Sequence, residues 1–130
     1  MSTLDTTKTH GAFSWSELMT TDPAAAVEFY GKLFGWTVDV MDMPDGKYHV
    51  VKAGESGVGG IMAIPKEAGP MPPNWGTYVT VNDVDATVGD CTRLGGKVAA
   101  GPIDIPKVGR FAVIQDPQGA YLNVITYKME

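Results

Sequence analysis

The residue with the clearest chemical potential is Glu17, an acid that stands among large apolar side chains. Trp15, Glu17 and Met19 would share one face of a strand, because successive strand side chains point to opposite faces. A carboxyl group buried among tryptophan and methionine would have a raised pKa and could act as a general base. The alternative is a structural carboxylate held by tyrosine or backbone donors, and the sequence leaves both interpretations open.

His49 is a second candidate acid or base, since histidine titrates near neutral pH. It follows Tyr48 in a short run typical of a strand, where a histidine can equally be structural or exposed. The chain has one cysteine, Cys91, which excludes an intrachain disulfide and a zinc site built from cysteines.

The elements that carry these residues can be predicted from local signals. Asp22 can cap a helix N-terminus, Pro23 suits the first helical position, and Gly35 suits its end. Alternation and turn residues then predict the strands of the first half. The predicted elements are a strand from Ala12 to Thr20, a helix from Pro23 to Phe34, and strands at Thr37 to Met41, Tyr48 to Lys52 and Gly59 to Ile64, with Pro44-Asp45-Gly46 as the first turn between strands.

The same order of elements repeats later in the chain. Residues 65–73 hold four prolines and are predicted to be a linker, because proline breaks helices and central strands. Asp22 then corresponds to Asp83, and Leu33 to Leu94, at the same offset. The second set is a strand from Trp75 to Val81, a helix from Val84 to Leu94, and strands at Lys97 to Ala100, Arg110 to Gln115 and Ala120 to Thr126. The repeat indicates two copies of one unit, module one at 12–64 and module two at 74–127.

Length and composition favour a single domain at 11–130 behind a flexible tail at 1–10. The net charge of −5 and the scattered basic residues argue against nucleic-acid binding. No apolar run is long enough for a membrane span, and the N-terminus lacks an apolar signal core. We therefore expect a cytoplasmic protein that binds neither nucleic acid nor membrane.

Five short motifs, in this order and spacing, resemble the vicinal-oxygen-chelate superfamily, which includes glyoxalase I, extradiol dioxygenases and the bleomycin resistance proteins. The motifs are Asp22-Pro23 before Glu28-Phe29-Tyr30, Leu33-Phe34-Gly35-Trp36, Val81-Asn82-Asp83-Val84-Asp85-Ala86, Leu94-Gly95-Gly96 and Asp116-Pro117-Gln118-Gly119. The resemblance implies an α+β fold of two tandem βαβββ modules, whose curved sheets form a cleft with the helices outside. It also makes a homodimer the expected assembly.

The resemblance further implies four metal-ligand positions, which in this sequence correspond to Trp15, Met62, Gly76 and Asn123. Only Asn123 offers an oxygen, whereas such sites need histidine nitrogens or carboxylate oxygens in number. We therefore expect neither the usual divalent metal nor another cofactor, although a non-standard metal site stays open.

Register predicts which side chains would line the cleft. The expected ligand-binding residues share the face of Glu17 or its counterpart in module two, and they are Trp15, Met19, Met62, Tyr78, Thr80, Tyr121 and Asn123. Their mixture of apolar bodies and a few polar groups suits a small, partly apolar ligand, but the same side chains could instead fill a core. The opposite set, Val79 with Val81 and Leu122 with Val124, suits packing on a helix.

Two functions follow from this sequence. The first is a glyoxalase-like domain that binds a small molecule without turnover, as the bleomycin-resistance branch of the family does. The second is an enzyme of the lyase, isomerase or dioxygenase type, with acid/base chemistry at Glu17 and His49 or a non-standard metal site.

Overall fold

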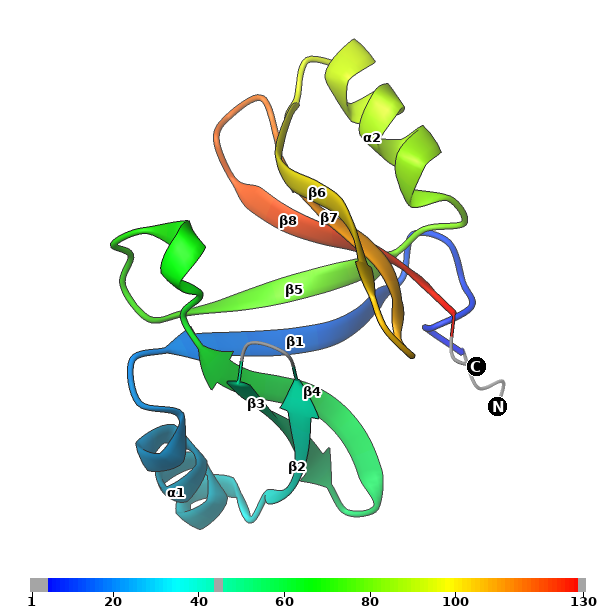
Figure 1. Cartoon of the computed structure of the whole chain (residues 1–130). Helices are drawn as coiled ribbons and strands as arrows, with labels where there is room; N and C mark the ends of the chain where they lie inside the picture. The colour runs from blue at the N-terminus through cyan, green and yellow to red at the C-terminus, as the bar shows by residue number, and fades with distance from the viewer. Residues whose placement is uncertain (1–4, 44–45, 129–130) are drawn as a thin grey trace. The chain divides into compact units, whose positions relative to one another are not determined.

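The computed structural model describes residues 5–43 and 46–128, and within them two βαβββ repeats follow one another (Figure 1). The predicted α+β fold of paired βαβββ modules is confirmed. Met1 to Leu4 of the expected tail, Pro44 and Asp45 of the first expected turn, and the last two residues lie outside the described residues.

The chain divides into two compact units, each of which is described by itself. The central unit is Trp15–Gly76, and the terminal unit combines the residues up to 14 with those from 77 onward. The central unit orders its strands β2-β3-β4-β1, with β1 parallel to β4 and the other pairs antiparallel. Its elements are β1 (Phe13–Thr20), α1 (Pro23–Phe34), β2 (Thr37–Met43), β3 (Gly46–Ala53) and β4 (Ser56–Ala63).

Helix α1 begins and ends as the sequence predicts. The Asp22 side chain accepts a hydrogen bond from the backbone N–H of Ala25 at 3.1 Å, and Pro23 follows at the first position. Gly35 ends the helix with φ of 76°, a left-handed conformation that glycine adopts without strain. The helix packs on a buried cluster of Leu18, Val51 and Ile61, so the core of this unit lies between α1 and one face of the sheet.

The terminal unit repeats this arrangement with its strands in the order β5-β8-β7-β6. Its elements are β5 (Asn74–Thr80), α2 (Val84–Arg93), β6 (Lys97–Ile105), β7 (Gly109–Gln115) and β8 (Tyr121–Tyr127). Only the part of β5 from Thr77 onward belongs to this unit. The core cluster is Val81, Val84, Ala112 and Val124, with Val79 packed against it. The predicted helix-facing valines of β5 and β8 are therefore confirmed. Helix α2 ends at Arg93, one residue before the predicted end, and Leu94 is its C-cap residue.

The strand bounds differ from the sequence prediction in several places: β2 ends at Met43, β3 begins at Gly46 and β4 begins at Ser56. Strand β6, at the edge of its unit, continues past the predicted end at Ala100 to Ile105, because Ile103 to Ile105 pair with β7 after a register shift. Such irregularities at an edge accommodate Pro102, which cannot donate a ladder hydrogen bond. The proline-rich linker contains a short 3-10 helix, η1 (Lys66–Ala68).

Residues 5–10 fall in the segment for which a flexible tail was predicted, and they contact the terminal unit. The backbone oxygen of Thr6 accepts a hydrogen bond from the Thr80 hydroxyl at 2.6 Å, and Nδ1 of His10 accepts one from the backbone N–H of Asn82 at 2.9 Å. Neither α-helix in the described part of the chain has the length and apolar character required to cross a bilayer.

Candidate functional site

The sheet of the central unit presents one face away from α1, and this face carries the candidate acid. Glu17 is the partner of Gly60 in the β1–β4 register, and Met19 is the partner of Met62. Paired residues lie side by side on the same face, so these positions share a face opposite that of the core residues Leu18 and Ile61. We call the set Trp15, Glu17, Met19, Tyr48, Gly60 and Met62 the Glu17 face.

Tyr48 contacts two other residues of this face, Trp15 and Gly60, and it was not among the site residues predicted from the sequence. Nε1–H of Trp15 donates a hydrogen bond to the Tyr48 hydroxyl at 2.9 Å. That hydroxyl occupies the place where a Cβ at Gly60 would stand, so only glycine leaves room for it there. Because Gly60 is the register partner of Glu17, the phenol lies beside the strand position of the carboxylate.

Glu17 is 8% exposed, which places a carboxyl group among mostly apolar neighbours. Burying such a group requires a hydrogen-bond partner, since an unpaired buried polar group is costly. Among the described residues, every buried side-chain nitrogen or oxygen has a hydrogen-bond partner. The carboxylate is therefore held in place on a face that also carries an indole N–H and a phenol.

His49 lies on the other face of the same strand. It is the register partner of Ile61, and its Nδ1 lies 3.3 Å from the Ile61 backbone oxygen. Because neighbouring strand residues point to opposite sides, the position of Tyr48 on the Glu17 face puts His49 on the α1 side. The structure does not bring the two predicted acid/base residues together.

The terminal unit carries the remaining predicted ligand residues. Tyr78 pairs with Asn123, which places both on the face opposite the valines that pack on α2. Tyr78 is 8% exposed, and Nδ2 of Asn123 donates to the backbone oxygen of Thr77 at 3.2 Å. The hydroxyl of Thr80 is engaged by Thr6, whereas Tyr121 is 67% exposed and has its ring in solvent.

The positions that correspond to metal ligands in the resembled family do not fit a metal in this chain. The side chains of Trp15, Met62 and Gly76 offer no oxygen or imidazole nitrogen, which leaves the Asn123 amide oxygen as the one such atom among the four positions. Within residues 5–43 and 46–128, no three His, Cys, Asp or Glu residues are grouped in a way that could hold an ion. A divalent metal at these positions would lack the ligands that such ions require.

A separate charged cluster ties α2 to the β6–β7 hairpin in the terminal unit. Arg110 donates two hydrogen bonds to Asp85, at 2.9 and 3.1 Å, and one to Asp104 at 3.0 Å. The hydrogen bond from Arg110 lowers the pKa of the Asp85 carboxyl, and Asp85 together with Asp104 raises the pKa of Arg110. Each of the three guanidinium nitrogens donates to one of these two carboxylates, so we interpret this cluster as structural.

The lowered pKa of Asp85 gives an acid-dependent prediction. Ionised Asp85 stabilises the folded state above its unfolded pKa of about 3.9, and this contribution is lost as the pH falls through the lower folded pKa. Asp85→Asn should therefore have a lower Tm than the wild type at pH 7, and the difference should disappear once the pH lies below the lowered pKa of folded Asp85. The effect should be small because the pair is exposed to solvent, and about 1 M NaCl should reduce it. Asp42→Asn, at an exposed position of β2, is the matched control; a difference that persists in acid would contradict the assignment.

Comparison with known proteins places these features in context. The sequence model of the Glyoxalase/Bleomycin resistance protein/Dioxygenase superfamily matches residues 12–124. The putative glyoxylase CFP32 of Mycobacterium tuberculosis is 44% identical over 116 residues, which cover 88% of this chain and 44% of that protein. The anthracycline biosynthesis protein DauV of a Streptomyces species is 32% identical over 127 residues, covering 88% of this chain and 46% of its own length. The chain thus spans less than half the length of these relatives.

Among solved structures, a hypothetical protein from Bacillus halodurans is similar with a TM-score of 0.73. The match covers 94% of this chain and 98% of the other, at 12% sequence identity. This similarity extends to the fold alone.

Proposed function

The chain belongs to the Glyoxalase/Bleomycin resistance protein/Dioxygenase superfamily, and on this premise we propose that it is a glyoxalase-like domain that binds a small, partly apolar molecule on the Glu17 face. The observation that carries the proposal is the arrangement of Glu17 and the Trp15–Tyr48 hydrogen bond among apolar side chains. Binding sites for small molecules have this composition, with a largely apolar lining and a few placed polar groups.

The chemistry of the face indicates what the ligand must offer. A carboxylate accepts a hydrogen bond, so the ligand should carry a hydroxyl or N–H group toward Glu17. The Tyr48 hydroxyl, which is positioned by Trp15, gives the face a second polar group that suits an oxygen-bearing ligand. Trp15, Met19 and Met62 supply polarisable apolar surface of the kind that aromatic ligands contact.

An aromatic ligand with hydroxyl and carbonyl groups satisfies these requirements. The relationship to an anthracycline biosynthesis protein, at 32% identity, supports the choice of an anthracycline as the first probe. The proposal requires no metal. Homodimer formation remains a prediction, which sedimentation velocity would test.

Calorimetric titration of the protein with an anthracycline tests the proposal. We expect Glu17→Gln and Tyr48→Phe each to weaken binding by about tenfold, because the first removes the charge that strengthens a hydrogen bond and the second removes the hydroxyl that holds the Trp15 indole. His49→Gln is the matched control, because it changes a polar residue on the same strand as Tyr48 but on the opposite face. Its affinity should equal that of the wild type.

Circular dichroism and thermal melting of all variants separate loss of binding from loss of folding. Equal affinity in the wild type, Glu17→Gln and Tyr48→Phe would contradict the assignment of the ligand to the Glu17 face. Loss of affinity only in His49→Gln would place the ligand on the α1 side of the sheet.

A second candidate is acid/base catalysis at Glu17, favoured by its low exposure next to a phenol. A carboxylate held in this way could remove a proton next to a carbonyl group, as an isomerase or lyase requires. The name of the mycobacterial relative, a putative glyoxylase, supports testing this chain for glyoxylase activity first. Turnover that is lost in Glu17→Gln and kept in His49→Gln would favour the enzyme; binding without turnover would favour the first proposal.

A further inference from the structure

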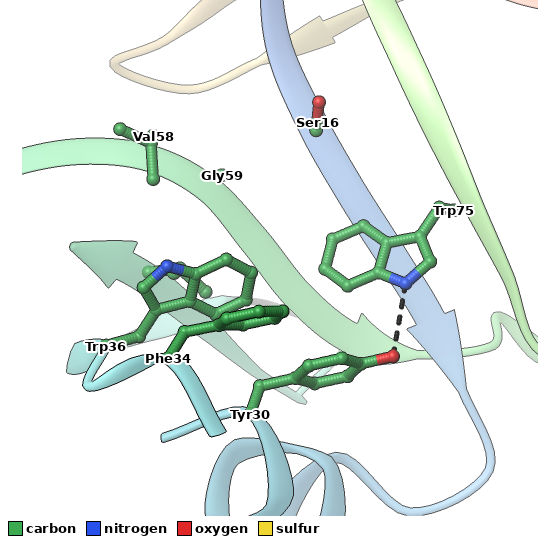
Figure 2. A pocket seen from close by; sticks show the side chains of 8 residues that line it. Ser16, Tyr30, Phe34, Trp36, Val58, Gly59 and Trp75 are labelled. Atoms are coloured by element: carbon green, nitrogen blue, oxygen red, sulfur yellow. Dashed lines mark hydrogen bonds between the residues drawn. The ribbon is translucent and has the colours of Figure 1, made fainter. Parts of the chain in front are cut away.

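The central unit has an open pocket on the α1 side of its sheet, opposite the Glu17 face. Its volume is about 540 Å³, and four aromatic side chains dominate its lining: Tyr30, Phe34, Trp36 and Trp75 (Figure 2). Tyr30 and Phe34 belong to α1, Trp36 lies two residues after its end, and Trp75 lies at the start of β5. Nothing in the proposed function uses this pocket.

The aromatic side chains form one continuous cluster. Trp75 contacts Tyr30 edge-on with ring centroids 5.5 Å apart, and its centroid lies 6.3 Å from that of Trp36. Phe34 contacts Trp36 at 5.0 Å. Nε1–H of Trp75 donates to the Tyr30 hydroxyl at 3.3 Å, so the polar ends of these two rings are directed at each other and their faces remain apolar (Figure 2).

An irregularity in β4 positions two of the residues that line the pocket. Val51 pairs with Gly59, whereas the next residue of β3, Lys52, pairs with Gly57, so Val58 is an extra residue. A bulge of this kind turns two consecutive residues toward the same side, and both Val58 and Gly59 line the pocket. Gly59 must be glycine because a Cβ there would meet the Ser16 backbone oxygen at 2.5 Å, and its missing side chain leaves the floor open.

Apolar side chains at the rim of the pocket are exposed to solvent. Trp75 and Val58 are each 43% exposed, and Phe34 is 58% exposed. Clustered exposed apolar groups around a concavity are typical of a binding site rather than of an ordinary surface.

We infer that this pocket is a second binding site, which takes a neutral, flat aromatic molecule of about two or three fused rings with one hydroxyl or carbonyl group. The lining contains no charged side chain, which disfavours an ionic ligand. The exposed face of Trp75 offers a stacking surface, and Ser16 supplies a hydroxyl for the ligand's polar group.

The three tryptophans of the chain provide a direct test. In a ¹⁵N-labelled protein, each indole N–H gives its own NMR signal; Trp36 and Trp75 report on this pocket, and Trp15 reports on the Glu17 face. We expect 2-naphthol to shift the Trp36 and Trp75 indole signals in a saturable way and to leave that of Trp15 unchanged. Binding to the Glu17 face would shift the Trp15 indole signal instead. The experiment therefore tests this pocket and the Glu17 face independently.

Val58→Phe is the informative variant because it narrows the pocket from an exposed position and adds no indole signal. It should weaken naphthol binding at least about tenfold, whereas Leu94→Ala, which shortens an exposed side chain of the terminal unit, should not. The dispersion of the remaining backbone signals shows whether the variant is folded.

Three results would overturn the inference. The first is a shift confined to Trp15, and the second is the absence of any saturable indole shift up to the solubility limit of naphthol. The third is self-association of the wild type that Val58→Phe abolishes, with no naphthol binding to either protein; the pocket would then be an interface between copies of the chain.

Discussion

Ile61→Ala should lower the free energy of unfolding by about 2–5 kcal/mol. Ile61 is fully buried at 0% exposure, and it packs with Leu18 and Val51 between β4 and helix α1. Removing its branched side chain takes away buried apolar surface and leaves a cavity that the surrounding strands cannot fully close. Urea denaturation followed by circular dichroism measures the change.

Val58→Ala is the matched control, since it shortens an aliphatic side chain of the same strand that is 43% exposed. Its effect on unfolding should stay within about 0.5 kcal/mol. Equal losses in the two variants would show that Ile61 does not belong to the tightly packed part of this unit.

Gly109→Ala should destabilise the terminal unit by about 1–3 kcal/mol, or more if the ladder separates. Gly109 is the register partner of Tyr127 in the β7–β8 ladder. A Cβ at this position would collide with the backbone oxygen of Thr126 and would lie 2.9 Å from the Cα of Tyr127. Both obstacles are backbone atoms, so no side-chain rotation relieves the clash, and the strands themselves must move.

Gly89→Ala makes the same chemical change in the opposite context. Gly89 lies inside helix α2, and a Cβ there would meet no atom within 4 Å. Because alanine favours the helix over glycine, this variant should stabilise the protein by about 0.5–1 kcal/mol. Opposite shifts of Tm in the two variants are the expected result; a stabilising Gly109→Ala would contradict the β7–β8 register.

Much of the fold could be predicted from local signals. Asp22, Pro23 and Gly35 determine where α1 begins and ends through interactions within a few residues, and the structure places its ends at the predicted positions. The ends of the strands were predicted less accurately, as β6 shows, because a strand continues wherever a neighbouring strand can pair with it.

The candidate site was predicted only in part, for a similar reason. Alternation correctly placed Trp15, Glu17 and Met19 on one face of β1 together with Met62 of β4. The same rule said that Tyr48 and His49 point to opposite sides, but it could not say which of them joins Glu17. That choice depends on how β3 pairs with β4, two strands whose register is decided by packing.

The sequence by itself determined the order of the elements, the repeat of the βαβββ unit, the helix ends and the family, because these depend on local preferences and on motif spacing. Only the tertiary structure decided that the Tyr48 hydroxyl fits over Gly60, that Val58 is an extra residue in β4, and that Trp75 closes an aromatic cluster with residues of α1. Each of these depends on contacts between segments far apart in the chain, where a shift of one residue would move every side chain to the other face.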